Sequence, residues 1–250
     1  MNIQPLSSDF WFARWFDSPY YARLYGHRDE AEARAFVSHL TTQLALPQGA
    51  AVLDLACGNG RHAEALHAQG LRVWGYDLSP TQLSQAQERT APGLQFRRHD
   101  MRTPFPDRGF SAVFNLFTSF GYFQTDAEHR GVLDHIHAAL IPGGHLVMDY
   151  FNLSYIRQNL VPEEEKNLDG VHFLIKRRIQ KGSIIKDIHI QDGHLHSFFS
   201  ERVRAYTPEA LEALLQRQGF GVTHRWGTYA GDRFHPEKSP RLILFARREN

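Results

Sequence analysis

The chain has 250 residues, a length that fits one sizeable domain or one domain carrying a substantial insertion. Its 28 lysines and arginines balance 27 aspartates and glutamates, so no global field directs the protein to nucleic acid or to a membrane surface. The single cysteine, Cys57, excludes an intramolecular disulfide framework and any multi-cysteine metal site. Nucleic acid is therefore disfavoured as a partner, and we expect no metal centre.

The chain shows no addressing signal that would take it out of the cytoplasm. Residues 1–12 lack the basic start and the apolar core of a secretion signal. No apolar run approaches the roughly 18 residues that a membrane-spanning helix needs. We expect a cytoplasmic protein that does not contact membranes.

The N-terminal segment, residues 1–48, is rich in aromatic side chains. Asp29 can cap a helix that continues to about Leu46. We expect a helical lid over a ligand. The alternative that stays open is a helix whose aromatic side chains pack against the sheet. The aromatic residues are Phe10, Trp11, Phe12, Trp15, Phe16, Tyr20, Tyr21 and Tyr25.

Strands and helices alternate over the next hundred residues. Helices are predicted to begin at Arg61, after Ser79 and after Thr125, the last two with capping boxes. Such alternation is typical of a parallel sheet with right-handed crossovers. The predicted strands are 51–56, 72–77, 94–99, 111–117 and 145–150.

The pattern changes after the fifth strand. Strands at 171–179, 184–191 and 194–206 are joined by two hairpin signals, Lys181-Gly182-Ser183 and Asp192-Gly193. A helix after Thr207 and strands at 221–227 and 242–246 follow. We therefore predict an α/β core with a doubly wound, seven-stranded Rossmann-like sheet, formed by residues 49–164 and 207–250. An antiparallel β cap over residues 165–206 would interrupt it.

The loop after the first strand points to nucleoside binding. Strand Val52–Leu55 runs into a turn with Gly58 and Gly60, and 19 positions after Gly58 the second strand ends at Asp77. Glycines let the backbone approach a ligand, and a carboxylate at that place accepts hydrogen bonds from a ribose diol. The same turn fits the loose nicotinamide or flavin pattern G-x-G-x-x-[GA]. Asp54 argues against a dinucleotide, because its negative charge would favour a cationic ammonium group over a pyrophosphate.

With these landmarks in order, the chain resembles the class I S-adenosylmethionine-dependent methyltransferases over about residues 50–150 and, more loosely, in its final helix and hairpin. The matching segments are Asp54-Leu55-Ala56-Cys57-Gly58-Asn59-Gly60, Asp77, Asp100-Met101, Asn115-Leu116-Phe117 and Leu140-Ile141-Pro142-Gly143-Gly144-His145-Leu146. The resemblance implies S-adenosyl-L-methionine as cofactor and S-adenosyl-L-homocysteine as product.

At the methionine end of the cofactor, the resemblance implies that Gly58 and Gly60 pack under the ligand. Ala56 would place its carbonyl near the ammonium group, and Asp54 would orient the loop or that group. Asn115 would also contribute at this end.

At the adenosine end, the resemblance implies that Asp77 holds the ribose hydroxyls and that Leu78 lies beside the adenine. Asp100 would accept a hydrogen bond from the adenine amino group, and Met101 would lie along the ring. Phe117, which follows the fourth strand, is the last residue that we expect to contact the cofactor.

Related enzymes also place an N-terminal tyrosine on the cofactor. Tyr25 is the expected residue, with Tyr20 and Tyr21 as further candidates and Arg28 as a partner for the carboxylate.

Methyl transfer from a sulfonium needs an in-line acceptor in a dry site, and aromatic walls stabilise the cation. We expect Tyr122 and Phe120 after the fourth strand to line the methyl pocket, with plain core packing as the alternative. A hydroxyl acceptor would need a base, for which we name His196 on the cap and, as an alternative, Tyr150.

The cap resembles that of small-molecule methyltransferases, including aminosugar and glycine N-methyltransferases. The leading interpretation is therefore transfer to N or O of a small-molecule acceptor by in-line displacement. The alternatives are an RNA or protein methyltransferase that uses a basic cap, and a non-catalytic regulatory binder of the cofactor. Whether the chain forms a homodimer stays open. The basic residues are Lys176, Arg177, Arg178, Lys181 and Lys186.

Overall fold

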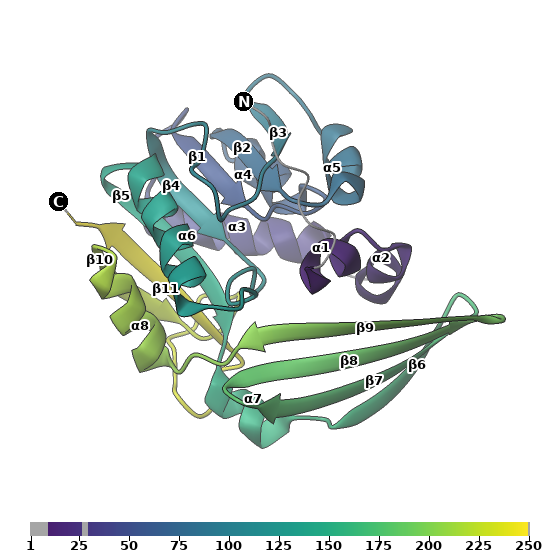
Figure 1. Cartoon of the computed structure of the whole chain (residues 1–250). Helices are drawn as coiled ribbons and strands as arrows, with labels where there is room; N and C mark the ends of the chain where they lie inside the picture. Colours follow the sequence, from purple (N-terminus) through teal and green to yellow (C-terminus); the bar gives the residue numbers. More distant parts are fainter. Residues whose placement is uncertain (1–9, 27–29, 250) are drawn as a thin grey trace.

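The computed structural model describes residues 10–26 and 30–249, and its centre is a seven-stranded sheet with the order β10-β11-β5-β4-β1-β2-β3 (Figure 1). Strands β1 to β5 are parallel, whereas β11 runs antiparallel to both β5 and β10. This order confirms the predicted doubly wound α/β sheet. Its strands are β1 Ala51–Leu55, β2 Arg72–Asp77, β3 Leu94–Arg98, β4 Phe110–Asn115, β5 Leu140–Phe151, β10 Phe220–Trp226 and β11 Arg241–Arg248.

Helices pack on both faces of this sheet, and their caps follow the sequence signals. Apolar side chains of α3 and α4 enter one buried cluster, and those of α6 and α8 enter another. The Thr125 hydroxyl and the Glu128 carboxylate form the predicted capping box of α6, and the Ser79 hydroxyl caps α5. In the described part of the chain, none of the helices combines the length and the apolar character needed to cross a bilayer. The helices are α3 Glu30–Leu44, α4 Arg61–Ala68, α5 Pro80–Gln87, α6 Asp126–Ala139 and α8 Pro208–Arg217.

A second, antiparallel sheet of four strands follows β5 and the short helix α7, Leu153–Asn159, and extends away from the core (Figure 1). It has one strand more than the sequence indicated, because the edge strand β6 is mostly charged and carries little β signal. Its strands are β6 Glu163–Leu168, β7 Val171–Gln180, β8 Ser183–Asp192 and β9 Leu195–Arg204.

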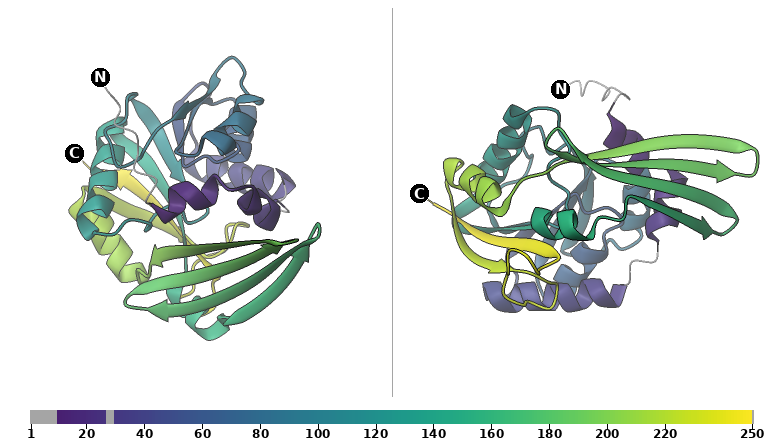
Figure 2. Two further views of the ribbon diagram at one scale, coloured as in Figure 1. Left: turned by 45° about the vertical axis from the view of Figure 1, so that its right-hand side comes forward. Right: turned by 90° about the horizontal axis from the view of Figure 1, so that it is seen from below.

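The N-terminal helices α1, Trp11–Phe16, and α2, Pro19–Tyr25, lie between the core and the second sheet (Figure 2). Trp15 and Leu24 share one buried apolar cluster with Phe173, Ile188 and Ile190 of that sheet. These helices therefore pack on the cap to form a joint layer beside the large sheet. Arg28 and the proposed helix cap Asp29 lie outside the described residues.

The joint layer allows a matched test of its packing. Phe173 is fully buried inside it, so Phe173→Ala should lower the free energy of unfolding by about 3–5 kcal/mol through lost burial and a residual cavity. Phe198 lies on the outer face with 55% exposure, so Phe198→Ala should change the free energy of unfolding by no more than about 0.5 kcal/mol. Urea denaturation measures the free energy of unfolding of both variants, and equal losses would contradict the assignment of the inner face.

Candidate active site

A cavity of about 1000 Å³ lies between the carboxyl edge of the large sheet, helices α1 and α2, and the inner face of the cap. Open α/β sheets bind their ligands at this edge. Eight of the candidate site residues line it: Tyr21, Tyr25, Asp54, Ala56, Gly58, Asp77, Phe117 and Tyr122.

The loop after β1 forms the floor of the cavity through left-handed backbone. Ala56 has a φ of 63° and Gly58 a φ of 54°, and both line the cavity. Gly60 has a φ of 82° but does not line it, and a Cβ there would approach ring atoms of Phe96 at 2.8 Å. The first glycine therefore leaves room at the cavity, whereas Gly60 allows helix α4 to start close to the neighbouring strands.

Asp77 fixes this loop against the end of β2. Its Oδ2 accepts from the backbone N–H of Gly58 at 2.8 Å, and its Oδ1 accepts from the N–H of Ser79 at 2.8 Å. Burial raises the pKa of Asp77, and the backbone N–H groups of Ser79, Gly58 and Leu78 act against that shift. A carboxylate has about four acceptor sites, so Asp77 keeps acceptor capacity for a hydroxyl of a ligand in the cavity.

Asp54 is a buried carboxyl group whose second oxygen has no hydrogen-bond partner among the described residues. The residue is 2% exposed and lines the cavity. Burial, with the neighbouring charge of Asp77, raises the pKa of Asp54 to about 7. Buried polar atoms without partners are rare, so this oxygen fits a ligand that brings a positive charge or a donor. The ammonium group of S-adenosylmethionine meets that requirement.

The loop after β4 is held in strained backbone by one carboxylate. Phe117 and Thr118 have φ values of 58° and 59°, which cost energy for residues other than glycine. Buried Asp149 accepts from the N–H of Phe117 and from the Arg241 Nε, each at 2.8 Å. Arg241 also donates to the Thr118 hydroxyl at 2.8 Å. This network holds the Phe117 ring at the cavity wall, with the Arg61 guanidinium 4.6 Å from its centre.

Tyr122 belongs to an aromatic wall of the cavity. Its ring centre lies 5.2 Å from that of Trp11 and 5.5 Å from that of Phe16, both on α1. All three residues line the cavity. Phe120 differs from our expectation, because it is fully buried against His129 and Tyr206 and does not line the cavity.

The cap contributes Glu201 of β9, which connects it to both N-terminal helices. The Glu201 carboxylate accepts from the Trp15 indole N–H at 2.6 Å and from the Tyr25 hydroxyl at 2.9 Å. Lys186 Nζ lies 3.7 Å from the same oxygen. Tyr25 therefore faces the cavity in a position set by the cap.

Several predicted cofactor residues lie beside the cavity without lining it. The Asn115 side chain donates to the carbonyl of Leu55 at 3.2 Å and joins the ends of β1 and β4. Leu78 offers its carbonyl to Arg98 Nε at 3.1 Å. For both, a contact with the cofactor stays a prediction.

Asp100 and Met101 lie in the turn after β3. Both Asp100 carboxylate oxygens accept from Arg102, Oδ1 from its backbone N–H at 3.0 Å and Oδ2 from its Nη2 at 2.7 Å. Met101 packs against the main core, and its carbonyl lies 3.2 Å from His135 Nδ1. Their expected contacts with adenine stay predictions.

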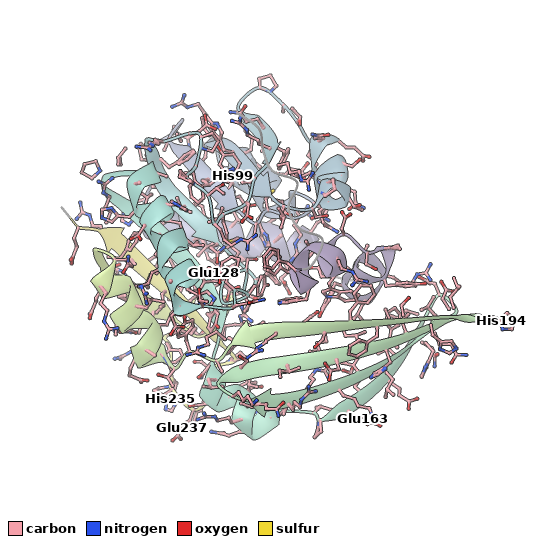
Figure 3. All side chains as sticks on the ribbon, viewed as in Figure 1. His99, Glu128, Glu163, His194, His235 and Glu237 are labelled. Carbon is pink, nitrogen blue, oxygen red and sulfur yellow. The ribbon has the colours of Figure 1, made fainter. Side chains whose placement is uncertain are left out.

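His196, our candidate base, lies away from the cavity. It is exposed and pairs with Gln191 next to the β8–β9 turn, and Figure 3 shows His194 projecting at that far tip. Residues next to the turn occupy the end of the hairpin, so the Asp192-Gly193 signal already implied this location. The same strand reaches the cavity five residues later, at Glu201.

Sequence reasoning did not select Glu201 or Gln82, although both line the cavity. Gln82 is 7% exposed in the first turn of α5. Because side chains alternate along a strand, Glu201 lies on the same face of β9 as Phe199. This alternation would have predicted Glu201 at the cavity if the face of Phe199 had been known to point inward.

Comparisons with known proteins agree with this geometry. Residues 52–144 match a family model described as a methyltransferase domain. A segment of 123 residues is 33% identical to dTDP-3-amino-3,6-dideoxy-alpha-D-glucopyranose N,N-dimethyltransferase of Streptomyces fradiae, covering 49% of this chain and 46% of that enzyme. A longer match, 27% over 217 residues, covers 82% of this chain and 87% of the putative methyltransferase YqeM of Bacillus subtilis.

Solved structures give the same fold. CalS10, an amino pentose methyltransferase from Micromonospora echinaspora solved with S-adenosylmethionine, is 25% identical with a TM-score of 0.66, covering 92% of this chain and 97% of that one. An S-adenosylmethionine-dependent methyltransferase from Clostridium acetobutylicum has a TM-score of 0.77 at 20% identity, covering 92% and 96%.

Residues 52–144 therefore carry a methyltransferase domain, in agreement with the resemblance to the class I S-adenosylmethionine-dependent enzymes. This confirms the predicted enzyme class and S-adenosylmethionine as its cofactor. The matched segments span less than half of the first two curated relatives, at 46% and 43% of their lengths. What this methyltransferase acts on is therefore a separate question.

The raised pKa of Asp54 predicts that cofactor affinity depends on pH. Below about pH 7 the free protein keeps Asp54 protonated, so binding the ammonium group first requires loss of that proton. The association constant of the cofactor should therefore reach its maximum above pH 7 and fall by up to tenfold per pH unit below pH 7. Calorimetry between pH 5.5 and 8.5 measures this.

Asp54→Asn is the matched control, because it keeps the shape and removes the titration. We expect weaker binding with a flat pH profile. An unchanged slope in this variant would contradict the role of Asp54.

Proposed function

We propose that this methyltransferase transfers the cofactor's methyl group to a nitrogen of a small-molecule amine by in-line displacement. The proposal rests on the cavity of about 1000 Å³, which runs from the loop after β1 to the inner face of the cap. Its size suits the cofactor together with a compact acceptor. S-adenosylmethionine supplies, when bound, an electrophilic methyl group on a sulfonium.

The chain's own residues position and shield this reaction. Asp77 and the loop after β1 bind one end of the cofactor, and α1 closes over the cavity. The rings of Trp11, Phe16 and Tyr122 exclude water and offer negative faces to a cation without acting as nucleophiles. With a neutral amine the positive charge moves from the sulfonium sulfur to the acceptor nitrogen during the transfer, so a dry and well-aligned site supplies much of the acceleration.

Amine acceptors are supported by the relatives' names. Besides the aminosugar N,N-dimethyltransferases, rat glycine N-methyltransferase is 31% identical over 134 residues, covering 47% of this chain and 45% of that enzyme. An amine can arrive neutral and needs no general base, which agrees with the position of His196 far from the cavity.

The alternative of an RNA methyltransferase with a basic cap finds less support. Of the five basic residues, Arg177 and Lys186 line the cavity instead of the outer face. Lys176 and Arg178 point outward, and each forms an ion pair with an acidic neighbour. A continuous positive face for phosphates is therefore lacking among the described residues of the cap.

A panel assay tests the proposal. The full chain and S-adenosylmethionine are mixed with amines, phenols, carboxylates or RNA, and S-adenosylhomocysteine release and product mass are followed. We expect N-methylated product from at least one amine. Product only from RNA or phenols, or no product with a cofactor that binds, would contradict the proposal.

Tyr122 provides a test of the aromatic wall on any amine that turns over. Tyr122→Phe keeps the ring and should leave kcat within about threefold, whereas Tyr122→Ala opens the wall and should lower kcat about 10- to 100-fold. Steady-state kinetics measure both. A loss of equal size in both variants would assign the effect to the hydroxyl instead of the ring.

A further inference from the structure

The inner face of the cap carries a charged row on three strands, which an acidic residue on the fourth strand continues diagonally. It consists of Glu164 on β6, Arg177 on β7, Lys186 on β8 and Glu201 on β9, and all four line the cavity. Arg177 pairs in register with Lys186, and Lys186 pairs with Glu201. Glu164 pairs in register with Ile175 and reaches Arg177 diagonally through its side chain. The order of charges along the row is therefore negative, positive, positive, negative.

Apolar rows border this charged row on both sides. One contains Ile175, Ile188 and Phe199, and the other contains Ile179, Ile184 and Val203. Charges between apolar rows on a cavity wall lose much of their hydration, which costs more than apolar packing would. The stability of the fold therefore does not account for these charges, which points to a role in binding.

The row forms two ion pairs, one on each side. Arg177 Nη2 lies 2.5 Å from the Glu164 carboxylate, and their side chains are 22% and 31% exposed. Lys186 lies 3.7 Å from Glu201, at 15% and 17% exposure. The hydrogen bond from Arg177 holds the pKa of Glu164 below its ordinary value. Both acidic partners stand on the outer sides of the row.

The two cations are therefore direct cross-strand neighbours in the middle of the row. Like charges directly opposite each other destabilise a sheet. Lys186 also donates to the Tyr25 hydroxyl, and its Nζ lies 4.5 Å from the centre of the Tyr25 ring. The two acidic residues lie at the ends of the row, so a negative group gains most in the space in front of Arg177 and Lys186.

We propose that Arg177 and Lys186 form a subsite for an anionic group, a carboxylate or a phosphate, on the acceptor. The acceptor is then an amine that carries a negative charge away from the nitrogen to be methylated. This inference rests on the proposed amine methylation and narrows its substrate class.

Binding of simple anions tests the subsite directly. The full chain, saturated with S-adenosylhomocysteine, is titrated with pyrophosphate, inorganic phosphate and acetate by calorimetry. Arg177→Gln and Lys186→Gln should each weaken binding of the preferred anion about tenfold or more. Comparison of the two phosphates with acetate distinguishes a phosphate subsite from a carboxylate subsite.

Matched controls come from the outer face of the same strand. Lys176→Gln and Arg178→Gln remove the same charge from exposed positions next to Arg177. We expect less than a twofold change in anion binding for both. Thermal melting identifies any variant that fails to fold, and two independent inner variants keep the test decisive.

Three outcomes would overturn the subsite. Equal losses in inner and outer variants would indicate general surface electrostatics, and no anion binding to the unmodified chain would remove the site. Loss of S-adenosylhomocysteine affinity in the inner variants would assign the cations to the cofactor's own carboxylate.

Methylation rates of charged and uncharged amines distinguish a failure of the anion subsite from a failure of the proposed function. Amines are compared in pairs with and without the charge, such as glucosamine 6-phosphate against glucosamine. A lower KM for the charged member that disappears in Lys186→Gln supports the subsite. Methylation of amines with no preference for charge overturns the subsite and leaves the proposed function intact.

Discussion

The site depends on the carboxylate of Asp77, which joins the ends of the first two strands. By accepting from the N–H groups of Gly58 and Ser79, it fixes the left-handed loop after β1 and the start of α5 together. Asp54 lies buried beneath that loop with an unpartnered oxygen. Two carboxyl groups so close would repel each other in a dry pocket, and a cationic nucleoside relieves both.

The cap and the N-terminal helices enclose the rest of the cavity as a joint layer. They share an apolar cluster around Trp15 and Phe173, and Glu201 binds both Trp15 and Tyr25 at the cavity wall. The acceptor side is thus built by segments that lie far apart in sequence. Helix α1 and Tyr122 contribute aromatic side chains to the cavity, and the cap contributes charged ones.

Local signals made most of the core predictable, and long-range pairing limited the rest. The glycine turn, Asp77 and the capping box at Thr125 are short-range features, and they appear where the sequence indicated them. Strand β6 was missed because its charged residues form a strand only by pairing with β7. Glu201 could be placed at the cavity only once the cap's inner face and its partners on α1 and α2 were known.

Our central claim is that the cavity binds S-adenosylmethionine beside Asp77 and Asp54. A crystal structure of the full chain with S-adenosylhomocysteine tests it most directly. We predict that the ribose hydroxyls lie within hydrogen-bond distance of the Asp77 carboxylate and that the amino-acid end lies over the loop that contains Ala56. A ligand bound elsewhere, or an Asp77 carboxylate turned away from the sugar, would contradict it.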